Sequence, residues 1–392
     1  MKILFVRTYC PNKLSYGAEL RALQFVDYFK QKGQMDLLTL TKPGEESDAV
    51  YIKKNFRNFY YFDQRGEHPR LNTLEKLITL LPWQINGFYA KDFQQRLNKI
   101  VEENQYDLIF VFKLEPVYFF LQLASKWHSR VVMDFDDILS DLYSKYYKNP
   151  ITSYKNSRSL KLYEKKALQR FNRVFVCSQD AVAKTHPHYR HKVGIIPNII
   201  QSSPENFLPV PHDRNRLLFV GSLDYLPNID GLKWFFQNVW PEFKALFPQV
   251  KLTIIGKSPQ DGKYVSSFLG DPRDVEIVIN VPSVEPYYRN CFATIVPLIV
   301  GSGTRLKILE SVSYHRPVLT TLKGLEGLAF RNNKEIMIFK DPRSFKKAYE
   351  ALLDPDRYQK MTKNALQVLE QEYSQNTFDN CMRFNIELLE RT

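Results

Sequence analysis

Short apolar runs alternate with amphipathic stretches along the first half of the chain. The runs are rich in β-branched and aromatic residues and occupy positions 3–6, 36–40, 107–112, 130–135 and 173–178. Segments with the apolar spacing of helices lie between them. Strands that alternate with helices form βαβ units, in which helices cover both faces of a parallel sheet. The pattern predicts a doubly wound domain over residues 1–200.

The same alternation begins again after a proline-rich segment. Residues 201–213 contain three prolines and few apolar positions, which favours a linker and a hinge. Strand-like runs return at 216–222, 251–257, 275–281, 293–298 and 316–321, and helical spacing is found at 228–247, 304–313, 343–353, 355–372 and 378–390. We therefore expect a second doubly wound domain at 201–375 and a C-terminal helix at 376–392 that can pack back on the first domain.

The expected fold class is therefore α/β, with two doubly wound Rossmann-like domains that face a cleft. A single hinge brings the carboxyl ends of both sheets to this cleft, and ligands of open α/β sheets bind at such ends.

Composition is that of an ordinary globular protein, with 44% hydrophobic and 25% charged residues. The cysteines are scattered without the spacing of a zinc site, which fits a reducing cytoplasm: Cys10, Cys177, Cys291 and Cys381. No apolar core of about 7 to 15 residues follows Met1, and no run of about 18 apolar residues occurs. We expect a cytoplasmic protein that starts at Met1 and is soluble or peripheral at the inner face of a membrane.

The formal charge of +13 is concentrated in one segment. Residues 141–200 carry twelve basic and three acidic side chains, among which several tyrosines are interspersed. This mixture suits an anionic membrane surface or nucleic acid. The alternative, a solvated helical face, accounts for the segment equally well.

The stretch GSGTRLKILE at 301–310 predicts a phosphate site. The four residues Gly301, Ser302, Gly303 and Thr304 separate a strand-like run from a helix that is expected to begin near Arg305. Glycines let a backbone approach an anion closely, and a helix start offers free N–H groups. Arg305 and Lys307 add two cations in the first turn, where a bound diphosphate would stabilise them. The alternative is a tight turn whose cations face water.

Glu310 is the second candidate of this stretch. Helical spacing places it beside Leu306 and Ser313, so its carboxylate needs partners. Sugar hydroxyls could supply them, and so could an ion pair with Lys307 or an arginine. The spacing alone leaves both interpretations open.

With these residues the chain resembles GT-B fold glycosyltransferases of the family 4 type, in particular bacterial transferases of surface polysaccharide synthesis. The resemblance spans nearly the whole chain and is most specific at VPSVEPYYRNCFATIVPLIVGSGTRLKILESVSYHRPVLTTLKGLEGL. LLFVGSLDYLPNIDGLKWF resembles the opening of the family's nucleotide-binding domain, and Gly17 and Glu19 match its Gly-x-Glu sequence.

The resemblance implies a sugar transfer with retention of anomeric configuration, from a nucleoside diphosphate sugar to a glycan or lipid-linked acceptor. It implies that Glu310 binds the donor ribose, that the glycine loop and nearby cations hold the diphosphate, and that the loop starting near Val281 meets the base. Further donor contacts are implied at Gly17 and Gly221. No metal, other cofactor or nucleic acid is expected.

Three positions depart from the family's pattern. The family has another glutamate eight positions before the one that matches Glu310, and this chain has Ser302 there. The arginine that often follows the glycine matching Gly221 is Ser222. A histidine that often ends a strand of the first domain is replaced by Asp136. The first departure predicts an unusual contact to the donor sugar.

The sequence DFDD at 134–137 follows an apolar run and so lies at the carboxyl end of an expected strand. Crowded carboxylates repel one another, and a raised pKa, a cation or the basic run from Lys145 would relieve the repulsion. We expect Asp136 or Asp137 to contact hydroxyls of the acceptor or of the donor sugar, as part of the catalytic site with Arg305 and Lys307.

Three other functions remain open. A sugar-nucleotide epimerase shares the GT-B architecture. The D-x-D sequence of VVMDFDDI also resembles haloacid dehalogenase-type phosphohydrolases, in which one aspartate attacks phosphorus and the next acts as acid and base. A basic nucleic-acid-binding protein would explain the charge, but it requires neither Glu310 nor a two-sheet cleft.

Overall fold

The structure is a computed structural model that divides the chain into two units. The described residues are 1–10, 18–41, 46–62, 82, 85, 93–121, 130–144, 149–200, 211, 213–258, 263–267 and 274–391. Unit 1 comprises Met1–Ile196 with Asp379–Thr392, and unit 2 comprises Pro197–Phe378. Gly17 and most of the expected linker lie outside the described residues.

Unit 1 contains a parallel sheet of seven strands in the order β3-β2-β1-β4-β5-β6-β7. The strands are β1 (Lys2–Arg7), β2 (Gln34–Thr39), β3 (Phe59–Tyr61), β4 (Leu108–Phe112), β5 (Arg130–Asp134), β6 (Arg173–Val176) and β7 (Val193–Ile195). In register, Ile3 pairs with Leu108 and Val111 with Met133. The order reverses between β1 and β4, which is the topological switch point of this sheet.

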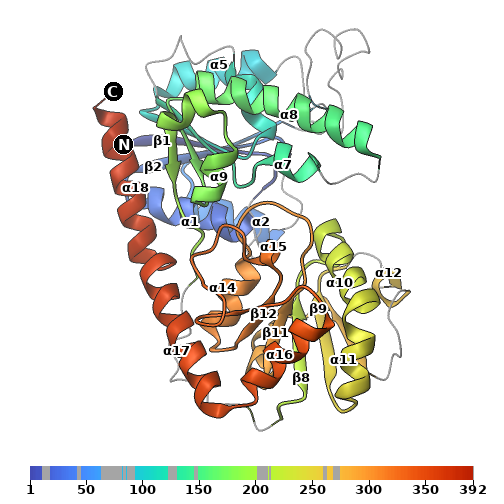
Figure 1. Ribbon diagram of the computed structural model, residues 1–392. Coiled ribbons are helices and arrows are strands. Elements are labelled where there is room, and N and C mark those ends of the chain that lie inside the picture. Colours follow the sequence, from blue (N-terminus) through green and yellow to red (C-terminus); the bar gives the residue numbers. More distant parts are fainter. Residues whose placement is uncertain are drawn as a thin grey trace. The chain divides into compact units, whose positions relative to one another are not determined.

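Helices cover both faces of this sheet, with α5 and α8 over one face and α1 and α2 over the other (Figure 1). The helices of the unit are α1 (Ala18–Lys30), α2 (Glu46–Asn55), α5 (Phe93–Asn104), α6 (Tyr118–Leu121), α7 (Leu139–Ser144), α8 (Pro150–Arg170) and α9 (Gln179–Lys184), with 3-10 turns at Glu115–Val117 and Pro187–Lys192. Phe25 of α1 packs on Phe110 of β4 with 4.7 Å between ring centroids. Successive side chains of a strand point to opposite faces of the sheet, so each strand contributes to the core on both faces.

The last helix, α18 (Gln375–Glu390), belongs to unit 1 from Asp379 onward. Asn385 is buried, and its Oδ1 accepts a 2.6 Å hydrogen bond from Nε of Arg173 on β6. A Cβ at Gly194 of β7 would lie 2.0 Å from the same Oδ1, so only glycine permits this close approach. The contacts fix the helix end to the edge of the seven-stranded sheet.

Unit 2 contains a parallel sheet of six strands in the order β10-β9-β8-β11-β12-β13. The strands are β8 (Arg216–Val220), β9 (Lys251–Gly256), β10 (Val275–Ile279), β11 (Ala293–Val296), β12 (Val318–Thr320) and β13 (Met337–Ile338). The helices are α10 (Leu226–Asn238), α11 (Trp240–Leu246), α12 (Lys263–Ser266), α13 (Glu285–Asn290), α14 (Leu306–Ser313), α15 (Leu322–Leu325), α16 (Pro342–Leu352) and α17 (Pro355–Glu372). The switch point of this sheet lies between β8 and β11.

The structure confirms the predicted fold class, because each unit is built on a parallel sheet with helices. It also adds strands β3, β7 and β13, which are only two or three residues long. The helix predicted at 228–247 is wrong as a single element. It breaks at Val239, where φ is −122° and ψ is −50°, and α11 carries Pro241 in its first turn. Among the described helices, none has the length and apolar character that a bilayer span requires.

Candidate functional site

The switch point of unit 2 brings together two glycine-containing strand ends. Gly221 follows β8, and the loop from Gly301 to Thr304 lies between β11 and α14. Because β8 and β11 are neighbours in the sheet, their carboxyl ends bound one crevice. The sequence predicted each segment separately, and the strand order places them at one crevice.

The glycine loop has a backbone that only glycine adopts easily. Gly301 has φ of 124° and Gly303 has φ of 73°, so a side chain at either position would be strained. Nη1 of Arg305 donates to the carbonyl oxygens of Ser302 and Gly303, and the Arg305 side chain is almost fully buried. Arg305 therefore stabilises the loop itself, a role that its sequence position did not indicate. Its proposed contact with a diphosphate stays a prediction.

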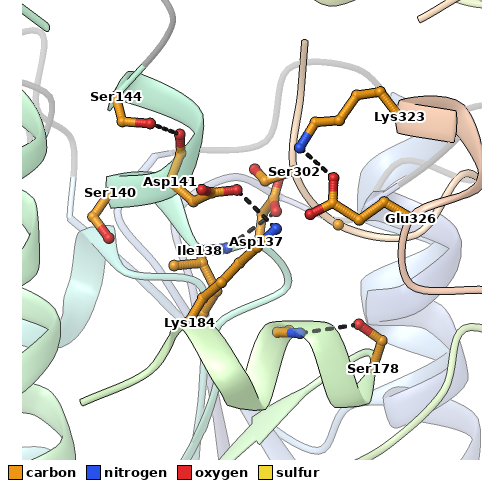
Figure 2. Close-up of polar contacts among 12 residues, drawn as sticks. Asp137, Ile138, Ser140, Asp141, Ser144, Ser178, Lys184, Ser302, Lys323 and Glu326 are labelled. Atoms are coloured by element: carbon orange, nitrogen blue, oxygen red, sulfur yellow. Dashed lines mark hydrogen bonds and ion pairs between the residues drawn. The ribbon is translucent and has the colours of Figure 1, made fainter. Parts of the chain in front are cut away.

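Two further loop residues differ in the partners of their hydroxyl groups. Thr304 Oγ1 accepts a 2.5 Å hydrogen bond from Nδ2 of Asn198. Ser302 is buried, and its hydroxyl has no hydrogen-bond partner within the part of the chain that the structure describes. Nη2 of Arg305 donates to the carbonyl oxygen of Lys323 in the segment after β12, and the side chain of Lys323 forms an ion pair with Glu326 (Figure 2). Helix α14 starts at Leu306, one residue later than expected, with Arg305 as its N-cap residue.

Lys307 extends from α14 toward Gly221. A Cβ at Gly221 would lie 2.5 Å from Nζ of Lys307, so a side chain at this position would displace the ammonium group. Nζ of Lys307 donates a 2.7 Å hydrogen bond to Oδ1 of Asn228, whose amide nitrogen donates to the Ser222 carbonyl. Although Lys307 is partly exposed, desolvation and then the charge of Arg305 lower its pKa to about 7. An anion beside this ammonium would restore its charge.

Glu310 lies one turn further along α14 and is held by Tyr288 of α13. The Tyr288 hydroxyl donates a 2.9 Å hydrogen bond to Oε2 of Glu310. Burial raises the pKa of Glu310, while this hydrogen bond and the charge of Lys307 lower it. Val281, which follows β10, packs on the apolar cluster that contains Tyr288. Within the described residues, Glu310 is bound by a tyrosine hydroxyl and not by Lys307, and its contact with sugar hydroxyls stays a prediction.

The carboxylates at 134–137 have different environments in unit 1. Asp134 is fully buried, and its two oxygens accept hydrogen bonds of 2.9 and 2.6 Å from Nε and Nη2 of Arg21. Nη1 of Arg21 donates to the carbonyl oxygen of Ile196. Asp134 therefore joins β5 to α1 and to the end of β7, and it is not available to a substrate.

Asp136 and Asp137 lie just beyond β5 and are partly exposed. Asp136 has φ of 59° and forms an ion pair with Lys113, at 3.6 Å. Asp137 Oδ1 accepts the N–H of Ile138, next to the Asp141–Lys184 ion pair (Figure 2). Arg21 of α1 and Lys113 after β4 thus reduce the repulsion between the neighbouring carboxylates that the sequence predicted. Lys145 and Lys148 of the basic run lie outside the described residues.

Sequence reasoning missed several residues of these sites, among them Asn228, Tyr288, Lys113 and Arg21. Asn228 and Tyr288 lie in helices that precede the glycine loop, and nothing in their spacing relates them to Lys307 or Glu310. Lys113 follows a predicted strand, as Asp136 does, and this common position was the available signal. The predicted residues Gly221, Lys307 and the glycine loop do lie together, whereas Gly17 is outside the described residues.

Comparisons with known proteins show what the chain is similar to. Residues 214–355 match the family model described as glycosyl transferases group 1. An uncharacterized 44.6 kDa protein in the cps region of Klebsiella pneumoniae is 24% identical over 365 residues, which cover 88% of this chain and 89% of that protein.

Two solved structures have the same fold over the full length. Sucrose-phosphate synthase from Thermosynechococcus elongatus superposes with a TM-score of 0.73 at 16% identity, covering 100% of both chains. Anabaena HepE in complex with UDP and glucose superposes with a TM-score of 0.66 at 13% identity, covering 99% of both. The fold is GT-B, and residues 214–355 match the glycosyl transferases group 1 domain.

Proposed function

We propose that this protein is a glycosyltransferase that moves a sugar from a nucleoside diphosphate sugar to an acceptor hydroxyl, with retention of anomeric configuration. One observation carries the proposal. The crevice between β8 and β11 combines a glycine loop with positive φ, a desolvated lysine and a tyrosine-bound glutamate. These features suit an anionic diphosphate that is linked to a ribose with two neighbouring hydroxyls.

Lys307 is the residue best placed to stabilise the leaving group. Negative charge develops on the diphosphate as its bond to the sugar breaks. A pre-positioned ammonium group and the loop N–H groups would stabilise this charge without reorganising, which can lower a barrier by several kcal/mol. Arg305 would contribute by keeping the loop rigid. The chemistry uses no metal and no other cofactor.

A donor screen tests this function. Thermal shift with a panel of nucleotide sugars should reveal stabilisation by one donor, with UDP sugars as the first candidates because HepE binds UDP and glucose. Glu310→Ala should abolish the stabilisation, whereas Glu350→Ala, on the surface of α16, should keep it. Donor binding that survives Glu310→Ala would refute the ribose assignment. NMR of the product anomeric proton tests retention.

The acceptor is proposed to be a glycan or lipid-linked sugar of a cell-surface polysaccharide. The relative in the Klebsiella cps region supports this class of product. A nucleotide-sugar donor supports a cytoplasmic location, at the inner face of the membrane where lipid-linked acceptors are extended.

Helix α8 supports contact with an anionic membrane surface. Ile151, Tyr154 and Leu162 are exposed by 66%, 63% and 54%. The same helix carries six cations, Lys155, Arg158, Lys161, Lys165, Lys166 and Arg170, and its one acidic residue, Glu164, is buried. Large apolar side chains among cations are typical of helices that lie in a membrane interface.

Liposome sedimentation tests the membrane contact. The protein should bind vesicles with anionic lipid, and a variant with Lys155→Glu, Arg158→Glu and Lys161→Glu should lose most of this binding. A matched variant with Lys346→Glu and Lys347→Glu, in unit 2, should still bind. Equal binding to neutral vesicles would contradict the proposal.

A sugar-nucleotide epimerase remains the second candidate on this fold. Incubation with labelled donors separates the two, because a transferase releases the nucleoside diphosphate and an epimerase returns a sugar nucleotide. The D-x-D phosphohydrolase interpretation is disfavoured, because it needs Asp134 as a nucleophile. Both oxygens of that carboxylate bond to Arg21 in the core.

A further inference from the structure

The switch point of unit 1 also carries a set of polar side chains. Arg7 ends β1 and Thr8 follows it, while Lys113 and Glu115 follow the neighbouring strand β4. Asp136 follows β5, and Glu19 lies in the first turn of α1. We call these six residues the switch-point cluster. They come from four elements that meet at the carboxyl end of the sheet.

Contacts connect the members of the cluster. Nη2 of Arg7 forms an ion pair with Glu19, and Nζ of Lys113 lies 3.6 Å from Oδ2 of Asp136. Cζ of Arg7 and Nζ of Lys113 each lie 5.9 Å from the centre of the Phe112 ring. Burial raises the pKa of Glu115 and the charge of Lys113 opposes this rise, so the two groups are neighbours as well.

Several polar atoms of the cluster are buried without a hydrogen bond. Within the described residues, no partner is found for Nε and Nη1 of Arg7, the Thr8 hydroxyl, Oε2 of Glu19 and Oε2 of Glu115. The Thr8 hydroxyl lies close enough to the Glu115 carboxyl to lower its pKa, but not in hydrogen-bond geometry. Arg7 and Thr8 are only 2% and 3% exposed.

Such atoms point to a ligand. A buried polar group without a partner costs about 1–3 kcal/mol, and native structures keep few of them. Lys113 adds strain, because it has φ of 71°, an uncommon conformation for a residue with a long side chain. Unpaired groups from three separate elements therefore mark a place that a polar molecule fills.

The chemistry of the groups selects the molecule. A phosphate or a carboxylate needs donors alone, but the cluster sets three carboxylates against two cations. Unpaired donors on Arg7 and Thr8 stand beside unpaired acceptors on Glu19 and Glu115. A ring with neighbouring hydroxyls is matched to this mixture, because each hydroxyl both donates and accepts.

We propose that the switch-point cluster binds an uncharged sugar ring and rejects sugars that carry a carboxylate or a phosphate. The ring belongs either to the acceptor or to the donor, and in both cases the chemistry is the same. The proposal rests on the proposed function for its role in transfer. The binding itself is independent of that function.

Ligand-observed NMR titration tests the site. The probes are the methyl α-glycosides of glucose, galactose and mannose. Each neutral glycoside is compared with the uronic acid that has the same ring configuration. Every titration is carried out with and without UDP. At least one neutral glycoside should bind, roughly tenfold more tightly than its uronic acid. Glu115→Gln should weaken the neutral glycoside roughly tenfold, because it removes a charged acceptor. Glu103→Gln, the same change on the exposed face of α5, should leave binding as in the wild type.

The outcomes separate the two proposals. A uronic acid that binds as tightly as its neutral partner, a Glu115→Gln variant with wild-type affinity, or no binding of any neutral glycoside overturns the inference. None of these results affects nucleotide binding, which the donor screen tests alone. Circular dichroism melting shows whether Glu115→Gln is folded, and Thr8→Val provides a second, uncharged variant with the same expected loss.

UDP-glucose and UDP distinguish the two sources of the ring if UDP-glucose is a donor. Weaker binding of UDP-glucose to Glu115→Gln, with unchanged binding of UDP, assigns the ring to the donor. Unchanged affinity for both, with weakened binding of the methyl glycoside, assigns it to the acceptor.

Discussion

The hydroxyl of Tyr288 donates a 2.9 Å hydrogen bond to Oε2 of Glu310, and this bond joins α13 to α14. Tyr288 is buried, and its ring stacks on that of Tyr314 with 4.8 Å between centroids. Its backbone carbonyl accepts a 2.7 Å hydrogen bond from Nε of Arg316. The carboxylate that we propose binds the donor ribose is thus oriented by a side chain that is itself fixed from two directions.

Tyr288→Phe should raise the KM for the donor roughly tenfold and leave kcat within a factor of about two. The ring keeps its packing, and the lost hydrogen bond to a charged acceptor is worth about 1.5–3 kcal/mol. Steady-state kinetics with the donor found in the screen provide the measurement. Tyr358→Phe is the control, because it removes another buried tyrosine hydroxyl of unit 2, one that donates to the Phe292 carbonyl.

Tyr288→Phe should also alter the pH dependence of donor binding. The Tyr288 hydrogen bond lowers the pKa of Glu310, which burial raises. Removing the hydroxyl raises that pKa further, so the acidic loss of donor affinity should shift to higher pH. An acidic limb that coincides with that of the wild type would show that Glu310 does not bind the donor as a carboxylate.

Lys307 should make diphosphate binding depend on pH near neutrality. Its pKa is lowered to about 7 by burial, so the free enzyme loses this charge as the pH rises through 7. A bound diphosphate favours the charged form, so binding takes up a proton and weakens as the pH rises. Calorimetry of UDP binding in buffers of different ionisation enthalpy measures the uptake. Lys307→Met should abolish it, and Lys346→Met, on the surface of α16, should not.

Lys307→Met should also raise the thermal midpoint of the ligand-free protein by several °C. A lysine whose pKa falls from 10.5 in the unfolded chain to about 7 when folded destabilises the fold at neutral pH. The sign follows from proton binding, because between these pH values the unfolded state binds more protons and stability rises with pH. A lower midpoint for the variant would contradict this. The lower stability of the wild type is the expected consequence of keeping a buried cation at the proposed diphosphate position.

Breaking the buried pair of Arg21 and Asp134 should destabilise unit 1 by about 3–5 kcal/mol, because one charge stays buried alone. Asp134→Asn is the test variant, and urea unfolding followed by circular dichroism measures the effect. The pair of Lys99 and Glu103 is the control, since both side chains are mostly exposed. Glu103→Gln should change stability by less than about 0.5 kcal/mol.

Glu164 of α8 should make the stability of unit 1 fall with rising pH. Burial raises its pKa from 4.5 to about 7, although hydrogen bonds from the hydroxyl and the N–H of Ser140 lower it. A group with a raised folded pKa stabilises fully below pH 4.5 and loses this contribution as the pH rises through 7. Glu164→Gln should flatten the decline of the thermal midpoint over this range. An equal decline in both proteins would show that Glu164 titrates normally.

The sequence by itself determined the fold class. Alternating apolar runs and helical stretches identified the longer strands of both sheets, because a strand buried on two faces must be apolar throughout. The two-residue strand β13 (Met337–Ile338) contains too few positions to show a pattern. The glycine loop at 301–304 was also readable, since only glycine tolerates its backbone.

Only the tertiary structure decided which polar residues share a site. Strand order sets which strand ends are neighbours, and it depends on contacts between residues far apart in the chain. It placed Gly221 against Lys307 and Tyr288 against Glu310. It also separated two aspartates that the sequence set together, because Asp134 faces Arg21 in the core whereas Asp136 faces Lys113 at the switch point. The role of a carboxylate depends on the groups beside it, and tertiary packing determines which groups those are.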